Sequence, residues 1–166
     1  IDIFNANIKI DCAEDGLDWN CMNSNIVGTT LTVNADDDAL EINNTYVEWY
    51  GNTLNLTAGE DGLDFYFDVA NHSEQTVALD ISQSVINIHS KQDGIWIYAY
   101  EYANIIDCIV NVTADRDGIN ILDYSNVYII DSTVNITAAD DGIYLTDSSL
   151  EIEANEGVCK VNINFF

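Results

Sequence analysis

The chain has 166 residues, 48% of them apolar, and a formal net charge of −25 at neutral pH. With 29 Asp and Glu against four Lys and Arg, it should repel nucleic acid and anionic membranes, so neither is an expected partner. The apolar content argues against disorder, and no apolar run is long enough for membrane insertion. We expect one folded domain spanning residues 1–166, with divalent cations among its carboxylates.

An Asp-Gly-aliphatic motif recurs along the chain at intervals of 23 or 24 residues, apart from one interval of 32 and a shorter last one. Its copies are Asp15–Leu17, Asp38–Leu40 (with Ala39 in place of Gly), Asp61–Leu63, Asp93–Ile95, Asp117–Ile119, Asp141–Ile143 and a degenerate Asn155–Val158. One rung of a β-helix, with three short strands and three bends, has about this length. We place the extra residues of the long interval in an inserted loop near 66–75.

Around each motif, apolar residues alternate with polar ones, as in strands with one buried face. The inward pairs before the motif are Ile8/Ile10, Leu31/Val33, Leu54/Leu56, Ile86/Ile88, Val110/Val112 and Val134/Ile136. Those after it are Leu17/Trp19, Leu40/Ile42, Leu63/Phe65, Ile95/Ile97, Ile119/Ile121 and Ile143/Leu145. A third inward column contains Ile3, Ile26, Trp49, Ile81, Ile105 and Ile129. The predicted fold is all-β, a right-handed parallel β-helix (solenoid) of about seven rungs, and a β-sandwich is the alternative.

The repeated pattern x-V-x-I-x-A-x-D-D-G-I, seen for example at Val134–Ile143, covers nearly the whole chain. It resembles the secreted carbohydrate-binding β-helix domains of clostridial and archaeal surface proteins, which are similar in fold to pectate lyases. The chain is poorer in Gly than the usual rungs of that family. The resemblance implies binding of Ca²⁺ and acidic polysaccharide.

The Asp of each motif has two interpretations. Gly at a bend would supply positive φ, and the preceding Asp would hydrogen-bond a backbone N–H of the turn. Stacked carboxylates about 5 Å apart repel one another, however, and Ca²⁺ binds such hard oxygen ligands. We therefore predict Ca²⁺ along the first three rungs, at Glu14, Asp15, Asp18, Asp37, Asp38, Glu41, Glu60, Asp61 and Asp64.

In the segment from Ile95 to Tyr102, four aromatic side chains occupy alternate positions and are expected to point outward, opposite the inward apolar side chains. They are Trp96, Tyr98, Tyr100 and Tyr102, and Tyr144 falls in the column of Trp96 two rungs later. Outward aromatics spaced along a strand predict a surface on which sugars stack, with acidic or neutral polysaccharide as the partner. The alternative is that the inserted loop folds over these rings and buries them.

A second outward column is rich in Asn and Thr, and stacked Asn side chains are expected to hydrogen-bond along the solenoid axis. Five Asn-x-Ser/Thr sequons are candidate N-glycosylation sites: Asn43, Asn55, Asn71, Asn111 and Asn135. The chain opens with Ile1 and not Met, which we interpret as a mature secreted form, extracellular or at the cell surface.

The remaining chemistry-bearing residues are few. Cys12 and Cys21 are candidates for a bridge at the first rung, whereas Cys108 and Cys159 are expected to lie too far apart. A Ca²⁺-dependent polysaccharide lyase is the enzymatic alternative, with Arg116 as the base. Its acidic neighbours would raise the pKa of Arg116, the wrong direction for a base, so we expect no catalysis.

Both ends lack a sequence typical of a cap, and this predicts end-to-end contacts through Ile1, Ile3, Phe165 and Phe166. The expected function is an extracellular Ca²⁺-binding β-solenoid that acts in carbohydrate or cell-surface attachment. The alternative is a structural protein that stacks head to tail into filaments.

Overall fold

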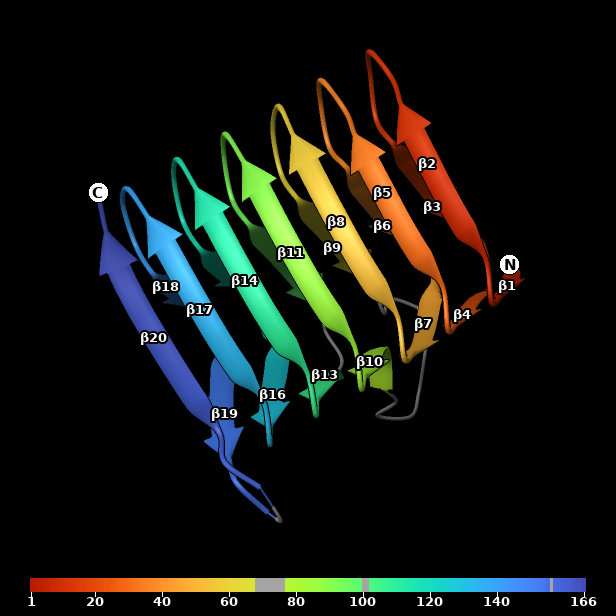
Figure 1. Ribbon diagram of the computed structural model, residues 1–166. Helices are drawn as coiled ribbons and strands as arrows, with labels where there is room; N and C mark the ends of the chain where they lie inside the picture. Colours follow the sequence, from red (N-terminus) through yellow and green to blue (C-terminus); the bar gives the residue numbers. More distant parts are fainter. Residues whose placement is uncertain (68–76, 100–101, 156) are drawn as a thin grey trace.

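The computed structural model describes residues 1–67, 77–99, 102–155 and 157–166, which form a right-handed parallel β-helix (Figure 1). Sheet A consists of β1 (Asp2–Phe4), β4 (Asn23–Val27), β7 (Tyr46–Tyr50), β10 (Val77–Ser82), β13 (Tyr102–Ile106), β16 (Asn126–Ile130) and β19 (Ser149–Glu153). Sheet B consists of β2 (Asn7–Asp11), β5 (Thr30–Asn34), β8 (Thr53–Ala58), β11 (Val85–Ser90), β14 (Ile109–Ala114), β17 (Thr133–Ala138) and β20 (Lys160–Phe165). Sheet C consists of β3 (Leu17–Asn20), β6 (Leu40–Asn43), β9 (Leu63–Phe67), β12 (Ile95–Ala99), β15 (Ile119–Leu122) and β18 (Ile143–Thr146).

The rungs follow one another from the N-terminus to the C-terminus (Figure 1). Six turns contain a strand in all three sheets, and β19 and β20 begin a seventh, close to the predicted number. Of the inserted loop expected near 66–75, Tyr66 and Phe67 belong to β9, and residues 68–76 lie outside the described part. Among the described residues there is no helix that could span a membrane.

The predicted inward columns are confirmed by the strand register. In sheet A, for example, Ile81 lies opposite Trp49 on one side and Ile105 on the other. These side chains are at most 2% exposed. The alternation of apolar and polar residues therefore fills one continuous core between the three sheets, as in other stacked-repeat proteins.

Positive φ angles occur at the corners between sheets A and B and between sheets C and A, and not at the Asp-Gly motifs, which connect sheet B to sheet C. Between sheets A and B, the residue with positive φ is successively Asn5, Gly28, Gly51, Gln83, Asp107 and Asp131. No motif glycine has a positive φ, so the predicted reason for these glycines is wrong. A Cβ added at Gly94 would instead lie 2.1 Å from Val112 Cγ1 and 2.5 Å from the carbonyl oxygen of Gly118. The motif glycine is required by the close approach of the neighbouring rung.

Candidate functional site

The motif aspartates form a hydrogen-bonded ladder along the solenoid. The Oδ1 atom of each Asp accepts a hydrogen bond from the backbone N–H of the next: Asp15 from Asp38 (3.3 Å), Asp38 from Asp61 (2.7 Å), Asp61 from Asp93 (2.7 Å), Asp93 from Asp117 (3.1 Å) and Asp117 from Asp141 (3.0 Å). Backbone donors thus stabilise one oxygen of each carboxylate. These bonds replace the hydrogen bond expected within each turn, because the donor is the backbone N–H of the following rung.

The most perturbed carboxylates lie on the second and third rungs. Burial, opposed by the ladder hydrogen bonds, raises the pKa of Asp38 and of Asp61 to about 6. Burial, reinforced by neighbouring carboxylates such as Asp38 and Asp61, raises the pKa of Asp64 to about 7. The Oδ1 atom of Asp64 is buried and accepts no hydrogen bond from the described residues. The charged forms of these carboxylates are therefore only partly stabilised by solvent and by hydrogen-bond donors.

The predicted nine-carboxylate Ca²⁺ site does not form a shell of protein ligands. Glu14, Asp18, Asp37 and Glu60 are exposed, and the Oε1 atom of Glu41 accepts a hydrogen bond from Asn43 at 2.8 Å. Within the described ranges, no group of three or more His, Cys, Asp or Glu side chains is placed to hold a metal ion. Binding of Ca²⁺ by these residues stays a prediction.

On the next two rungs, the protein supplies its own cation. The side chain of Asp93 is fully buried. Its Oδ1 atom accepts a hydrogen bond from Arg116 Nε at 2.6 Å. Its Oδ2 atom accepts one from Arg116 Nη2 and another, at 2.8 Å, from Asn120 Nδ2. Arg116 Nη2 also lies 4.0 Å from Asp61 Oδ1. The hydrogen bond to Asp93 raises the pKa of Arg116 above its usual range, which disfavours a role as a base.

The predicted aromatic strip is divided between two sheets, which corrects the expectation of a single strand. Trp96 and Tyr98 are on β12, whereas Tyr102 begins β13 in sheet A, where its ring lies 5.8 Å from that of Tyr128. Tyr100 lies outside the described residues.

A different aromatic cluster occupies the outer face of sheet C. Tyr66, expected at the start of the inserted loop, lies opposite Tyr98 and stacks on it with a centroid distance of 4.9 Å and an interplanar angle of 15°. Trp96 stacks on Tyr98 at 5.9 Å and 8° and lies opposite Asp64. Tyr144 is in the column of Trp96, as predicted, and is exposed. The stacked rings and the perturbed carboxylate thus belong to one surface patch.

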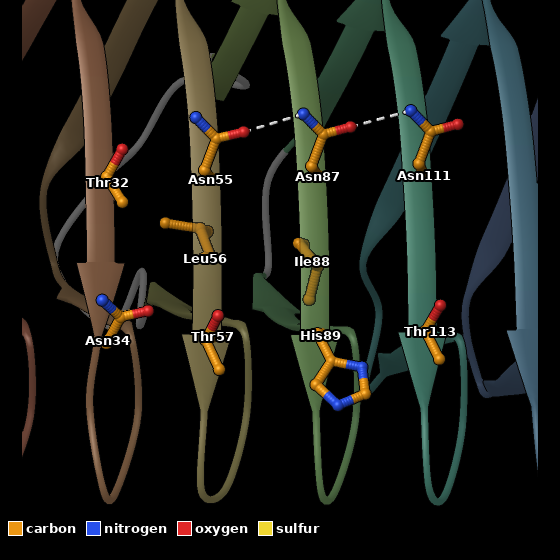
Figure 2. Close-up of a pocket in the computed structure, with 10 residues that line it drawn as sticks. All are labelled: Thr32, Asn34, Asn55, Leu56, Thr57, Asn87, Ile88, His89, Asn111 and Thr113. Atoms are coloured by element: carbon orange, nitrogen blue, oxygen red, sulfur yellow. Dashed lines mark hydrogen bonds between the residues drawn. The ribbon is translucent and has the colours of Figure 1, made fainter.

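The outer face of sheet B carries a groove of about 340 Å³, whose lining residues are drawn in Figure 2. It is lined by Thr32, Asn34, Asn55, Leu56, Thr57, Asn87, Ile88, His89, Asn111 and Thr113. The predicted Asn ladder is confirmed: Asn87 donates to Asn55 at 2.9 Å, Asn111 to Asn87 at 2.8 Å and Asn135 to Asn111 at 2.9 Å. The groove follows this ladder from rung to rung.

Three candidate glycosylation sites, Asn55, Asn111 and Asn135, are members of this ladder. The Nδ2 atom of Asn43 donates to Glu41, and Asn71 lies outside the described residues. Glycosylation at the described sequons stays a prediction.

All four cysteines are free, so the candidate bridge between Cys12 and Cys21 is absent. Their thiols donate to backbone carbonyl groups; Cys12 Sγ, for example, lies 3.3 Å from the carbonyl oxygen of Glu14. Burial raises the pKa of Cys108 to about 11, as expected for a packed thiol.

At the ends of the solenoid, Ile1, Phe165 and Phe166 are exposed, and Ile3 is half-buried. The end-to-end contacts predicted for these residues, and with them the filament, stay predictions.

Comparison with known proteins found no family model that matches the chain and no curated protein or solved structure that matches it. The resemblance to carbohydrate-binding β-helix domains therefore rests on the repeat pattern alone.

Proposed function

We propose that this protein is a secreted attachment module that binds acidic polysaccharide through a bridging Ca²⁺ on the outer face of sheet C. The observation that carries the proposal is the patch in which Asp64 and Tyr66 on β9 lie beside Trp96 and Tyr98 on β12. Aromatic rings bind the apolar faces of sugars, and a carboxylate beside them binds hydroxyl groups or a cation.

The chemistry of Asp64 supports the cation. Its buried Oδ1 atom has no donor among the described residues, and the Asp61 carboxylate belongs to the same cluster. A cation held by these two groups would keep several coordination positions for water and ligand oxygens. Binding would be weak, in the ~0.1–1 mM range of extracellular calcium modules.

The comparison with Asp93 supports the same conclusion. On that rung, the Arg116 guanidinium is bound by a carboxylate of the same column. Asp38, Asp61 and Asp64 belong to the same acidic face, and only Asp61 is within 4.0 Å of a Lys or Arg nitrogen among the described residues. Their mutual repulsion favours uptake of a mobile cation.

Net charge explains why the cation and the ligand would bind together. A uronate polymer is repelled by a protein of charge −25, so contact requires a counter-ion that both partners share. Ca²⁺ has enough coordination positions to bind Asp61, Asp64 and a sugar carboxylate at once. The function proposed is binding without catalysis.

A calorimetric titration with polygalacturonate fragments tests this function, in excess CaCl₂ and in EDTA at equal ionic strength. We expect binding only with Ca²⁺. Trp96→Ala should weaken it about tenfold, because loss of one stacking contact corresponds to roughly 1.4 kcal/mol. Asp64→Asn should abolish most of the Ca²⁺ dependence.

Tyr50→Ala is the matched control, since Tyr50 is exposed on sheet A, away from the patch. The Tyr50→Ala variant should bind the polygalacturonate fragments with the affinity of the unchanged protein. Equal binding in EDTA, or an equal loss in the Trp96 and Tyr50 variants, would refute the proposal.

A further inference from the structure

The groove on sheet B has a different chemistry from the sheet C patch. Figure 2 shows its two rows of side chains, one with Thr32, Asn55, Asn87 and Asn111 and the other with Asn34, Thr57, His89 and Thr113. The rows cross four adjacent parallel strands, β5, β8, β11 and β14. At ~4.8 Å between strands, the groove is about 14 Å long.

The five central strands of this face carry no outward Asp, Glu, Lys or Arg, although the molecule as a whole is strongly acidic. The outward residues of β5, β8, β11, β14 and β17 are Thr30, Thr32, Asn34, Thr53, Asn55, Thr57, Val85, Asn87, His89, Ile109, Asn111, Thr113, Thr133, Asn135 and Thr137. Sheets A and C, by contrast, present acids such as Glu48 and Glu41 on their outer faces. His89 is the one ionisable side chain that lines the groove, and Asp11 lies at its end, where it accepts a hydrogen bond from Asn34 at 2.6 Å. The remaining lining is uncharged, which favours an uncharged ligand.

The ladder leaves each Asn with hydrogen-bonding capacity. A side-chain amide has two N–H donors and two acceptor lone pairs. The bonds from Asn87 to Asn55 and from Asn111 to Asn87 use one donor and one acceptor of Asn87. Asn87 therefore keeps one donor and one acceptor, and the ladder fixes their positions before a ligand arrives. Pre-organised groups of this kind reduce the entropy that binding costs.

The spacing of these groups selects the shape of the ligand. Equivalent donors and acceptors recur at ~4.8 Å in a straight row. The sugar residues of an extended β-1,4-linked glycan repeat at nearly the same distance and are turned over alternately, so each residue can place a hydroxyl group, of alternating type, at one rung. An α-1,4-linked glycan coils, and its hydroxyl groups leave such a row after one or two residues.

We propose that the sheet B groove is a second binding site, for an uncharged β-1,4-linked glycan that lies along the solenoid axis and is held by the Asn and Thr rows without a metal ion. This site goes beyond the proposed function, because it lies on another sheet and uses neither a carboxylate nor a cation. A polymer chain with neutral and acidic parts could then contact two faces of the molecule.

The test is a titration of the ¹⁵N-labelled protein with cellohexaose in EDTA, followed by NMR, with maltohexaose as the coiled counterpart. We expect cellohexaose to shift the side-chain amide signals of Asn87 and Asn111, and maltohexaose to bind at least about tenfold more weakly. Thr57→Val should lower cellohexaose affinity about fivefold, because it removes one hydroxyl group from the groove while it keeps the β-branched shape and every bond of the Asn ladder.

Asn87→Asp and Asn104→Asp form a matched pair. Both positions are half-buried and outward-facing, Asn87 in the groove and Asn104 on sheet A. Only the first should weaken cellohexaose binding. Equal affinity for the two hexasaccharides, no binding of cellohexaose, or unchanged binding by both groove variants would overturn the proposal. Because these titrations contain no Ca²⁺ and no uronate, their failure leaves the sheet C function standing, and the reverse also holds.

Discussion

Gly94→Ala is expected to lower the free energy of unfolding by about 3 kcal/mol, the upper range for forcing an extra methyl group into a packed interior. The added Cβ would lie 2.1 Å from Val112 Cγ1 and 2.5 Å from the carbonyl oxygen of Gly118. Both neighbours belong to the adjacent rung, and relief would require the rungs to move apart. Urea unfolding followed by circular dichroism measures the loss.

The protein contains its own control for this prediction. Ala39 occupies the same column, and the inward residue in the place of Val112 is there Leu56. Leucine has no branch at Cβ, so the methyl group that would meet the added Cβ is absent. The hydrogen bond from Leu40 N–H to the carbonyl of Gly62 is 3.3 Å, against 3.0 Å for the equivalent bond from Leu63 to Gly94. The rungs are slightly further apart where alanine is present.

Val112→Leu should therefore rescue part of the loss. In a double-mutant cycle, Gly94→Ala is expected to cost about 1–2 kcal/mol less in the Val112→Leu background than in the unchanged protein. An equal cost in both backgrounds would show that the clash with the Gly118 carbonyl is decisive and that the β-branched neighbour is not the cause.

The fold could be predicted because the same physical constraint is repeated in every rung. The position of each residue relative to the motif determines whether its side chain faces inward. An error in the register would therefore have placed polar residues inward in several columns at once. The glycines illustrate the limit of this approach. Their column was recognised, but the cause lay in the distance to Val112 and its equivalents, which depends on how closely neighbouring rungs approach.

The aromatic strip was predicted wrongly because alternation continues across a corner. Trp96, Tyr98 and Tyr102 occupy alternate positions of the sequence, yet Trp96 and Tyr98 belong to sheet C and Tyr102 belongs to sheet A. The necessary signal was in the columns, since Ile105 stacks on Ile129 and therefore places Tyr102 in sheet A. Tyr66 was missed because the inserted residues were assumed to begin directly after the core strand, whereas its partner in the column is Tyr98.

The pairing of charges was beyond prediction from columns alone. Arg116 lies between Asp115 and Asp117 in the sequence, but its side chain donates to Asp93 and Gln92 on the preceding rung. Side-chain length and direction decide such contacts. The same holds for Asp64, whose Oδ1 is buried without a donor among the described residues while Asp18, in the same column, is exposed.

In EDTA, the free energy of unfolding is expected to fall by about 3 kcal/mol as the pH rises from ~5 to ~8. Addition of Ca²⁺ at the higher pH is expected to restore it. Burial raises the pKa of Asp38 and Asp61 to about 6 and that of Asp64 to about 7. In the unfolded chain these groups titrate near ~3.9, so between the two values the folded state holds protons that the unfolded state has released. Folding is then favoured at low pH, and this contribution is lost as the pH rises through 6 and 7.

Asp64→Asn separates this effect from the general repulsion of a highly charged chain. Asparagine keeps the shape of the side chain and cannot ionise, so thermal unfolding should show a flatter pH profile and a smaller rise with Ca²⁺. Asp36→Asn removes one exposed carboxylate from the same region and should leave the slope unchanged. If both variants had the slope of the unchanged protein, the loss of stability would arise from net charge spread over the surface, and the bridging cation at Asp61 and Asp64 would lose its physical basis.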